Sequence, residues 1–158
     1  MLEVFMKILV YIFLPIVMLF CFPSFSIAEL NADFEGTFNI FTTQNATITD
    51  TTTVDSGMGY IIKGKLCNLN KTLKQLNSTQ IRGVSVEFDS SKNEVEKLIS
   101  KYRIRKISAE ELETTSFIYG YTPYLPLYST IDGKKINIQI AYSDNHVKIG
   151  YPLILDGV

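Results

Sequence analysis

Histidine, cysteine and net charge are all scarce in this chain. Its 158 residues include one histidine and two cysteines, and 15 basic against 16 acidic side chains leave a formal net charge of −1. Zinc sites need several His, Cys or carboxylate ligands, and nucleic-acid binders carry a strong basic excess. Gly57-Met58-Gly59 precedes a strand pattern rather than a helix, so it does not match a phosphate-binding loop. We therefore expect no metal, no cofactor and no nucleic-acid partner.

One apolar run stands near the N-terminus. Residues 8–22 are apolar, and Ser26-Ile27-Ala28 places small side chains at the positions that a signal peptidase must accommodate. The pattern predicts a signal peptide over residues 1–28, with cleavage between Ala28 and Glu29. The protein is then expected outside the cytoplasmic membrane, either secreted or in the cell envelope.

The same segment has alternative interpretations. If it is not cleaved, residues 6–28 would anchor the protein, and only then would a membrane be a partner. A spanning helix usually needs about 20 apolar residues, and this run is shorter and contains Pro15. A lipoprotein signal is disfavoured because bulky Phe20 precedes Cys21. Met6 is a second candidate start.

Removal of the signal peptide leaves about 130 residues, the usual size of one domain. Residues 29–57 are rich in Thr and Asn, and predict either an edge strand or hairpin, or a tether that spaces the domain from a surface. Residues 58–158 carry the regular periodicity of a folded domain. Cys67 is the only cysteine after the signal peptide, so no internal disulfide is expected.

Two helices are predicted. The first begins at Asn68 and places three leucines, the last of them Leu76, on one face. The second follows a capping box in which Ser91 accepts from the Glu94 amide, and its apolar residues recur at helical spacing. A further cap signature at residues 108–111 predicts one more turn of helix.

Alternating apolar residues predict several strands. Asp132-Gly133 predicts a two-residue hairpin turn, because type I′ turns need positive φ at both positions. Across residues 134–142 the isoleucines should point inward, and Asn137, Gln139 and Ala141 outward. The order of elements indicates an α+β fold, a mainly antiparallel sheet with two helices on one face. Expected strands cover residues 58–66, 83–88, 104–107, 116–121, 127–131, 134–142 and 147–155.

Three stretches in the last third carry a family resemblance. Gly120-Tyr121-Thr122-Pro123, residues 131–141 and residues 149–155 resemble the YwmB-like family of exported bacterial proteins, over about Met58–Val158. The resemblance implies a fold like that of the TATA-box-binding protein, with a curved sheet but no DNA binding. It also implies a link to envelope or sporulation processes, by analogy alone.

No catalytic pattern is recognisable. Nucleophilic catalysis needs a nucleophile, a base and an orienting group, and nothing in the sequence supports a Cys67–His146 pair. We expect Cys67 to be a small buried residue and His146 to be solvated beside a turn. The alternative is a hydrolase that acts on envelope polymers through unidentified carboxylates. The acidic residues Glu110, Glu111 and Glu113 are interpreted as a solvated helix start.

Several tyrosines and two prolines surround the connection after residue 121. Tyrosines on a Pro-stiffened loop make good contact anchors, so Tyr121, Tyr124 and Tyr128 are the candidate binding residues. The alternative is core packing, and Tyr119 or Tyr121 is expected to face the core. The sequence thus predicts an exported, non-catalytic interaction module whose partner is another envelope protein or an envelope polymer.

Overall fold

A computed structural model of the chain describes residues 34–156. The predicted signal peptide and its cleavage site lie outside the described residues. The helices are α3 (Leu69–Gln75) and α4 (Lys92–Lys101), with short 3₁₀ turns η1 (Leu66–Asn68) and η2 (Ser78–Gln80). The strands are β1 (Gly36–Thr42), β2 (Thr51–Asp55), β3 (Tyr60–Lys65), β4 (Ile81–Asp89), β5 (Arg105–Leu112), β6 (Thr115–Tyr121), β7 (Ser129–Ile131), β8 (Lys134–Ile136), β9 (Ile138–Ser143) and β10 (His146–Tyr151).

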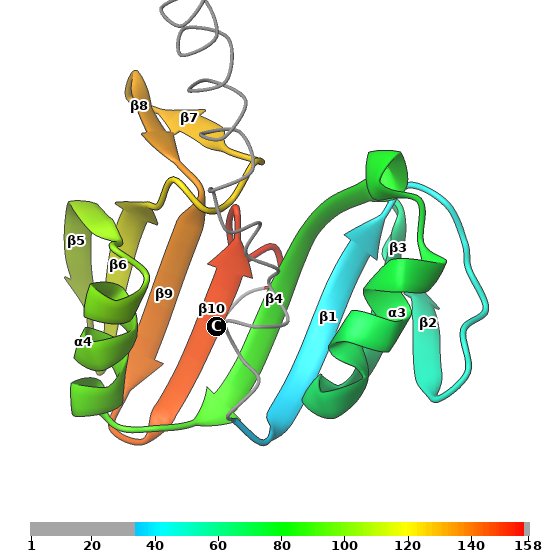
Figure 1. Cartoon of the computed structure of the whole chain (residues 1–158), viewed down its shortest axis with the longest axis horizontal. Helices are drawn as coiled ribbons and strands as arrows, with labels where there is room; N and C mark the ends of the chain where they lie inside the picture. The colour runs from blue at the N-terminus through cyan, green and yellow to red at the C-terminus, as the bar shows by residue number, and fades with distance from the viewer. Residues whose placement is uncertain (1–33, 157–158) are drawn as a thin grey trace, which may run out of the picture.

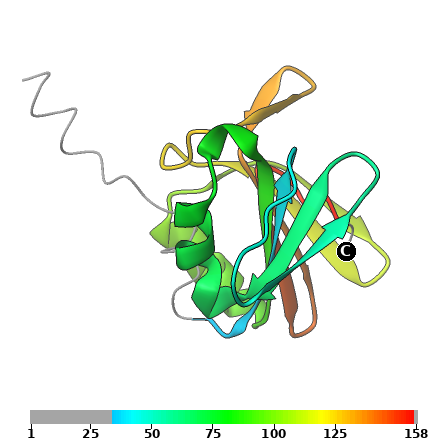
Figure 2. The same cartoon turned by 90° about the vertical axis from the view of Figure 1, so that its right-hand side faces the viewer.

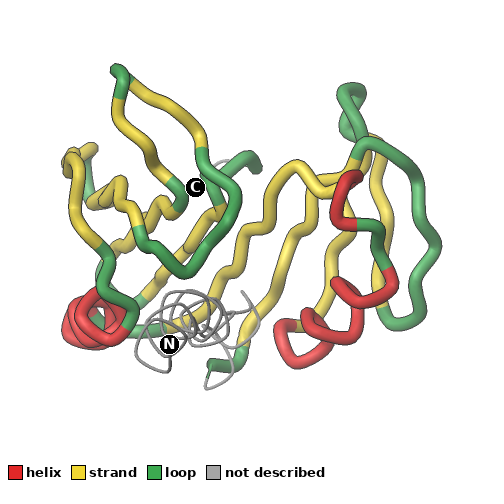
Figure 3. The backbone as a smooth tube through the Cα atoms, turned by 45° about the horizontal axis from the view of Figure 1, so that its top comes forward, coloured by secondary structure: helices red, strands yellow, loops and turns green. Residues whose placement is uncertain are grey.

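Eight strands form one antiparallel sheet in the order β2-β3-β1-β4-β10-β9-β6-β5, and β7 and β8 form a separate hairpin (Figure 1). Helices α3 and α4 lie on the same side of the sheet (Figure 2). Figure 3 shows them near opposite ends of that sheet. The predicted α+β class with a mainly antiparallel sheet is confirmed.

The core lies between the sheet and the two helices. Alternate residues of each strand face it, as the period of two requires: Ile40 of β1, Val86 of β4 and Ile149 of β10 are all fully buried. The helices contribute Leu69, Val95, Leu98 and Ile99 to the same cluster. In the part of the chain that the structure describes, neither helix has the length and hydropathy needed to cross a bilayer.

The start of α4 differs from the capping box predicted for it. Ser91 occupies the N-cap position, but its side chain makes no capping hydrogen bond. The amide of Glu94 instead donates to the backbone carbonyl of Ser91 at 3.0 Å. The helix is present because its apolar residues pack on the core, which stabilises short helices more than any cap does.

The Thr- and Asn-rich segment belongs to the sheet. Strand β1 lies between β3 and β4, with Phe38 and Ile40 fully buried, and β2 forms the edge beyond β3. The tether interpretation is therefore wrong for residues 36–55. The predicted edge strand is present as β2, whereas β1 is an interior strand.

Two further predictions from local pattern are wrong. Residues 108–111 continue strand β5 rather than starting a helix, because β5 pairs with β6 as far as Leu112. The strand expected to run to residue 155 ends at Tyr151, and β10 lies between β4 and β9. The hairpin turn is confirmed, with φ of 49° at Asp132 and 73° at Gly133.

After β10 the C-terminal residues cross the face of the sheet that points away from the helices. The Ile154 amide donates to the side-chain oxygen of Gln139 at 3.0 Å. Gly150 permits this close approach, since a Cβ there would lie 2.2 Å from the nitrogen of Ile154. Gln139 and Ala141 are consequently buried, which corrects the expectation that they face solvent.

Candidate binding pocket

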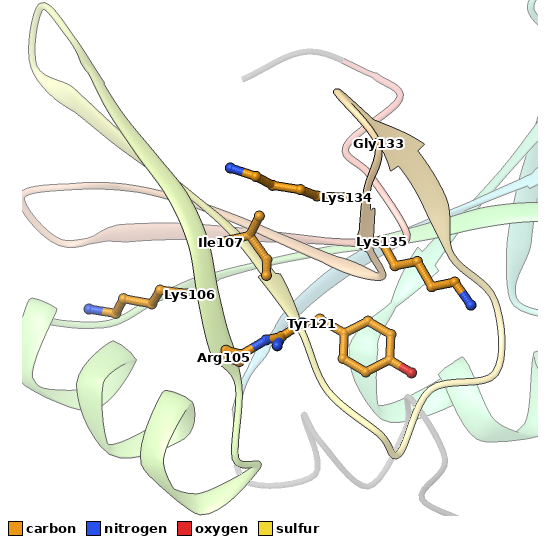
Figure 4. A pocket seen from close by; sticks show the side chains of 7 residues that line it. All are labelled: Arg105, Lys106, Ile107, Tyr121, Gly133, Lys134 and Lys135. Carbon is orange, nitrogen blue, oxygen red and sulfur yellow. The ribbon is translucent and has the colours of Figure 1, made fainter.

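A pocket of about 700 Å³ opens between the β5–β6 edge of the sheet and the β7–β8 hairpin (Figure 4). Arg105 is the register partner of Tyr121. The pairing shifts between Lys106 and Ser108, so Ile107 is the extra residue of a bulge and turns toward the pocket. The lining residues are Arg105, Lys106, Ile107, Tyr121, Gly133, Lys134 and Lys135.

Four of the lining residues are basic and none is acidic. Lys106 is neutralised, because its Nζ lies 3.0 Å from a carboxylate oxygen of Glu96 on α4. Among residues 34–156, no carboxylate forms an ion pair with Arg105, Lys134 or Lys135. The pocket lining therefore includes three cations that form no ion pair with a carboxylate of residues 34–156.

Aromatic rings partner two of these cations. The Arg105 guanidinium lies 6.0 Å from the centre of the Tyr121 ring, and Lys135 Nζ lies 4.4 Å from that of Tyr128. Figure 4 shows Lys134 and Lys135 leaving β8 in opposite directions, as neighbours on a strand do. A cation over an aromatic face is held in place without being neutralised.

A buried polar network holds the loop that directly follows Tyr121. Asn137 is fully buried. Its side-chain oxygen accepts from the Thr122 amide at 2.8 Å, and its Nδ2 donates to the carbonyls of Thr122 at 2.7 Å and Leu125 at 3.0 Å. The Thr122 hydroxyl donates to the Tyr102 carbonyl at 2.8 Å, which ties this loop to the end of α4. The prediction that Asn137 points to solvent is wrong, because the Pro-containing loop covers it.

The structure separates the candidate tyrosines. Tyr121 lines the pocket, and Tyr128 is half-exposed beside it under Lys135. Tyr124 is half-buried on the same loop and is outside the pocket lining. Of the three, only Tyr121 lines the pocket, and Tyr128 is linked to it through the lining residue Lys135.

The expectation that Tyr119 or Tyr121 faces the core is wrong. Two residues apart on β6, they share one face, and the residues that alternate with them, Ile118 and Gly120, are buried on the other. Both tyrosines lie on the side of the sheet away from the helices. Burial first, and then the negative charge of Glu110, raise the pKa of Tyr119.

A second polar cluster lies on that same face, across β4 and β10. Lys148 is buried, and its Nζ lies 3.1 Å from Asp156 and 3.7 Å from Glu87. Asp156 also accepts from Ser85 at 3.1 Å and from the Asn39 side chain. Acids and bases alternate here, so the cluster attaches the C-terminal residues to the sheet.

The other residues that the sequence analysis considered for catalysis, Cys67 and His146, do not come together in a site. Cys67 is exposed on η1, contrary to the buried position expected for it. His146 is half-exposed beside its turn, as expected, and lies 3.1 Å from Glu87 and 3.5 Å from Asp89. Strands β1 and β4 separate β3, which precedes Cys67, from β10, which carries His146. Among residues 34–156, no three His, Cys, Asp or Glu side chains gather as a metal site would require.

Sequence reasoning missed the cations of the pocket. Lys134 and Lys135 directly follow the predicted hairpin turn, and Arg105 directly follows the segment after α4. Only the register of β5 on β6, and the position of the β7–β8 hairpin beside them, places these residues together.

Comparisons with protein-family models, with curated proteins and with solved structures found no match to this chain.

Proposed function

We propose that this chain is an exported bacterial protein of the cell envelope, a non-catalytic module that binds an envelope protein or polymer. Membership of the YwmB-like family, a fold like that of the TATA-box-binding protein, and a link to envelope or sporulation processes are parts of the same proposal. The antiparallel sheet with both helices on one side agrees with that fold.

The observation that carries the proposal is the pocket between β5–β6 and β7–β8. It combines exposed aromatic surface with cations that no acid of residues 34–156 neutralises. Tyr and Arg are the residue types enriched at contact surfaces. The Asn137 network holds the loop that follows Tyr121, so this part of the surface is organised before a partner arrives.

The hydrolase alternative would require at least two carboxylates whose side chains lie close together in the folded chain. Glu87, Asp89 and Asp156 are linked through shared basic partners, because His146 contacts the first two and Lys148 contacts Glu87 and Asp156. Glu87 and Asp156 both pair with Lys148, and Asp156 accepts two further hydrogen bonds. This arrangement favours attachment of the C-terminal residues over acid–base chemistry, and so supports binding as the function.

Replacing both Tyr121 and Tyr128 with alanine is expected to weaken binding to envelope material by about 30-fold or more, because the loss of even one anchor residue costs about 2 kcal/mol, which is about 30-fold in affinity. The measurement is co-sedimentation of the full chain with envelope from the producing bacterium. Tyr119→Ala is the matched control, since Tyr119 lies on the same strand and face but does not line the pocket. Equal binding by the double variant and the unaltered chain, with both folded, would refute the proposal.

A further inference from the structure

We propose that the pocket between β5–β6 and β7–β8 binds a linear polyanion, a polymer that carries repeated phosphate or carboxylate groups. The inference rests on the proposed function and names the chemical class of its partner. The pocket carries a basic residue on each wall, Arg105 on β5 and the pair Lys134 and Lys135 on β8.

The acidic residues of β5 lie at the far end of that strand from the pocket. Strand β5 begins with Arg105 and Lys106, and carries Glu110 and Glu111 toward its other end. Five residues of strand span about 17 Å, which is twice the Debye length of about 8 Å at physiological ionic strength. The acidic end therefore leaves the field at the pocket largely intact. Asp132 precedes the two lysines in the hairpin turn but pairs with neither of them.

The excess of basic residues in the pocket is not a consequence of the net charge of the chain. The chain as a whole is nearly neutral, with a formal net charge of −1. The groove of about 540 Å³ beside β3 shows the more ordinary arrangement, in which Lys63 and Lys65 share the lining with Asp50 and Glu87. Of these two sites, only the pocket between β5–β6 and β7–β8 is lined by basic residues without an acidic one.

The directions of the cations favour a chain over a single small anion. Arg105 lies against the Tyr121 ring, which leaves the edge of its planar guanidinium able to bind an oxyanion through two N–H groups. Lys134 and Lys135 diverge from β8 (Figure 4), so no single phosphate or carboxylate can contact all three cations. Successive oxyanions of one polymer can do so, and linked contacts strengthen each other.

The test is binding of the full chain to inorganic polyphosphate, to poly-L-glutamate and to neutral dextran, measured by fluorescence anisotropy over a range of salt concentrations. The variant is Lys134→Glu with Lys135→Glu. The matched control is Lys63→Glu with Lys65→Glu, which makes the same change in net charge at the other groove. We expect the pocket variant to weaken polyanion binding by about 30-fold and the control by less than about 3-fold. Binding of the unaltered chain should fall steeply as salt rises.

The outcomes distinguish phosphate from carboxylate as the recognised group, and failure of the polyanion proposal from failure of the proposed function. Binding of polyphosphate alone identifies phosphate as the recognised group, and binding of polyglutamate alone identifies carboxylate. Equal losses in the two variants, or binding of neutral dextran as tight as that of either charged polymer, would overturn the inference. If neither polymer binds while Tyr121→Ala with Tyr128→Ala still abolishes envelope binding, the polyanion is wrong and the proposed function stands. If the tyrosine variant also binds envelope normally, both proposals fail.

Discussion

Replacing Asn137 with alanine is expected to lower the free energy of unfolding by about 3 to 4 kcal/mol. The change leaves the Thr122 amide and the carbonyls of Thr122 and Leu125 without the partners that Asn137 gives them. A buried polar group without a partner costs roughly 1–3 kcal/mol, and relaxation of the loop recovers part of that sum. No other side chain reaches all three backbone groups in the described hydrogen-bond network.

Urea denaturation of the full chain measures this change. Asn93→Ala is the control, because Asn93 is exposed on α4 and its replacement should alter the free energy of unfolding by less than about 0.5 kcal/mol. The Asn137 variant should also bind envelope material more weakly, because the loop that carries Tyr128 loses its attachment. A loss of stability below about 1 kcal/mol would mean that the network does not organise the loop.

Replacing Lys148 with methionine is the second change with a large expected effect, a loss of about 3 kcal/mol. Lys148 is 7% exposed and is the cation for both Asp156 and Glu87. Removing one member of a buried ion pair typically costs 3–5 kcal/mol, because the remaining charge has no partner. The donors Asn39 and Ser85 still reach Asp156, so we expect a value at the low end.

The double variant Lys148→Met with Asp156→Asn tests the reason for that loss. Removing both charges should be less destabilising than the sum of the two single changes, since no buried charge is then left unpaired. Lys97→Met is the exposed control, because Lys97 pairs with Glu94 on the surface of α4, where such pairs contribute little. A Lys148 variant as stable as the Lys97 variant would show that the cluster does not hold the C-terminal residues.

Local pattern was sufficient where the element and its partner are close in sequence. The helix α4 follows from its apolar spacing, and the hairpin at Asp132-Gly133 from the need for positive φ. Strands β4 and β6 follow from alternation of apolar residues. In each case the residues that decide the structure lie within about ten positions of one another.

The predictions fail where a distant segment decides the structure. Strand β1 lies in a Thr- and Asn-rich segment, yet it is interior because β3 and β4 pair on both sides of it. Asn137 and Gln139 looked solvent-facing, but the Pro-containing loop covers one and the C-terminal residues cover the other. The pocket also depends on pairing between strands that are distant in sequence. Local sequence pattern could therefore suggest Tyr121 as a binding residue, but not the basic residues that lie beside it.

Mapping of the contact surface tests most directly whether the pocket is where this protein binds. Amide resonances of the isotope-labelled chain would be followed while soluble fragments of the bacterial envelope are added. We predict that the shifts concentrate at Arg105, Lys106, Ile107, Tyr121, Gly133, Lys134 and Lys135, the residues that line the pocket. Shifts confined to the groove beside β3, around Lys63 and Glu87, would contradict the assignment, as would saturating binding with no shift at the pocket.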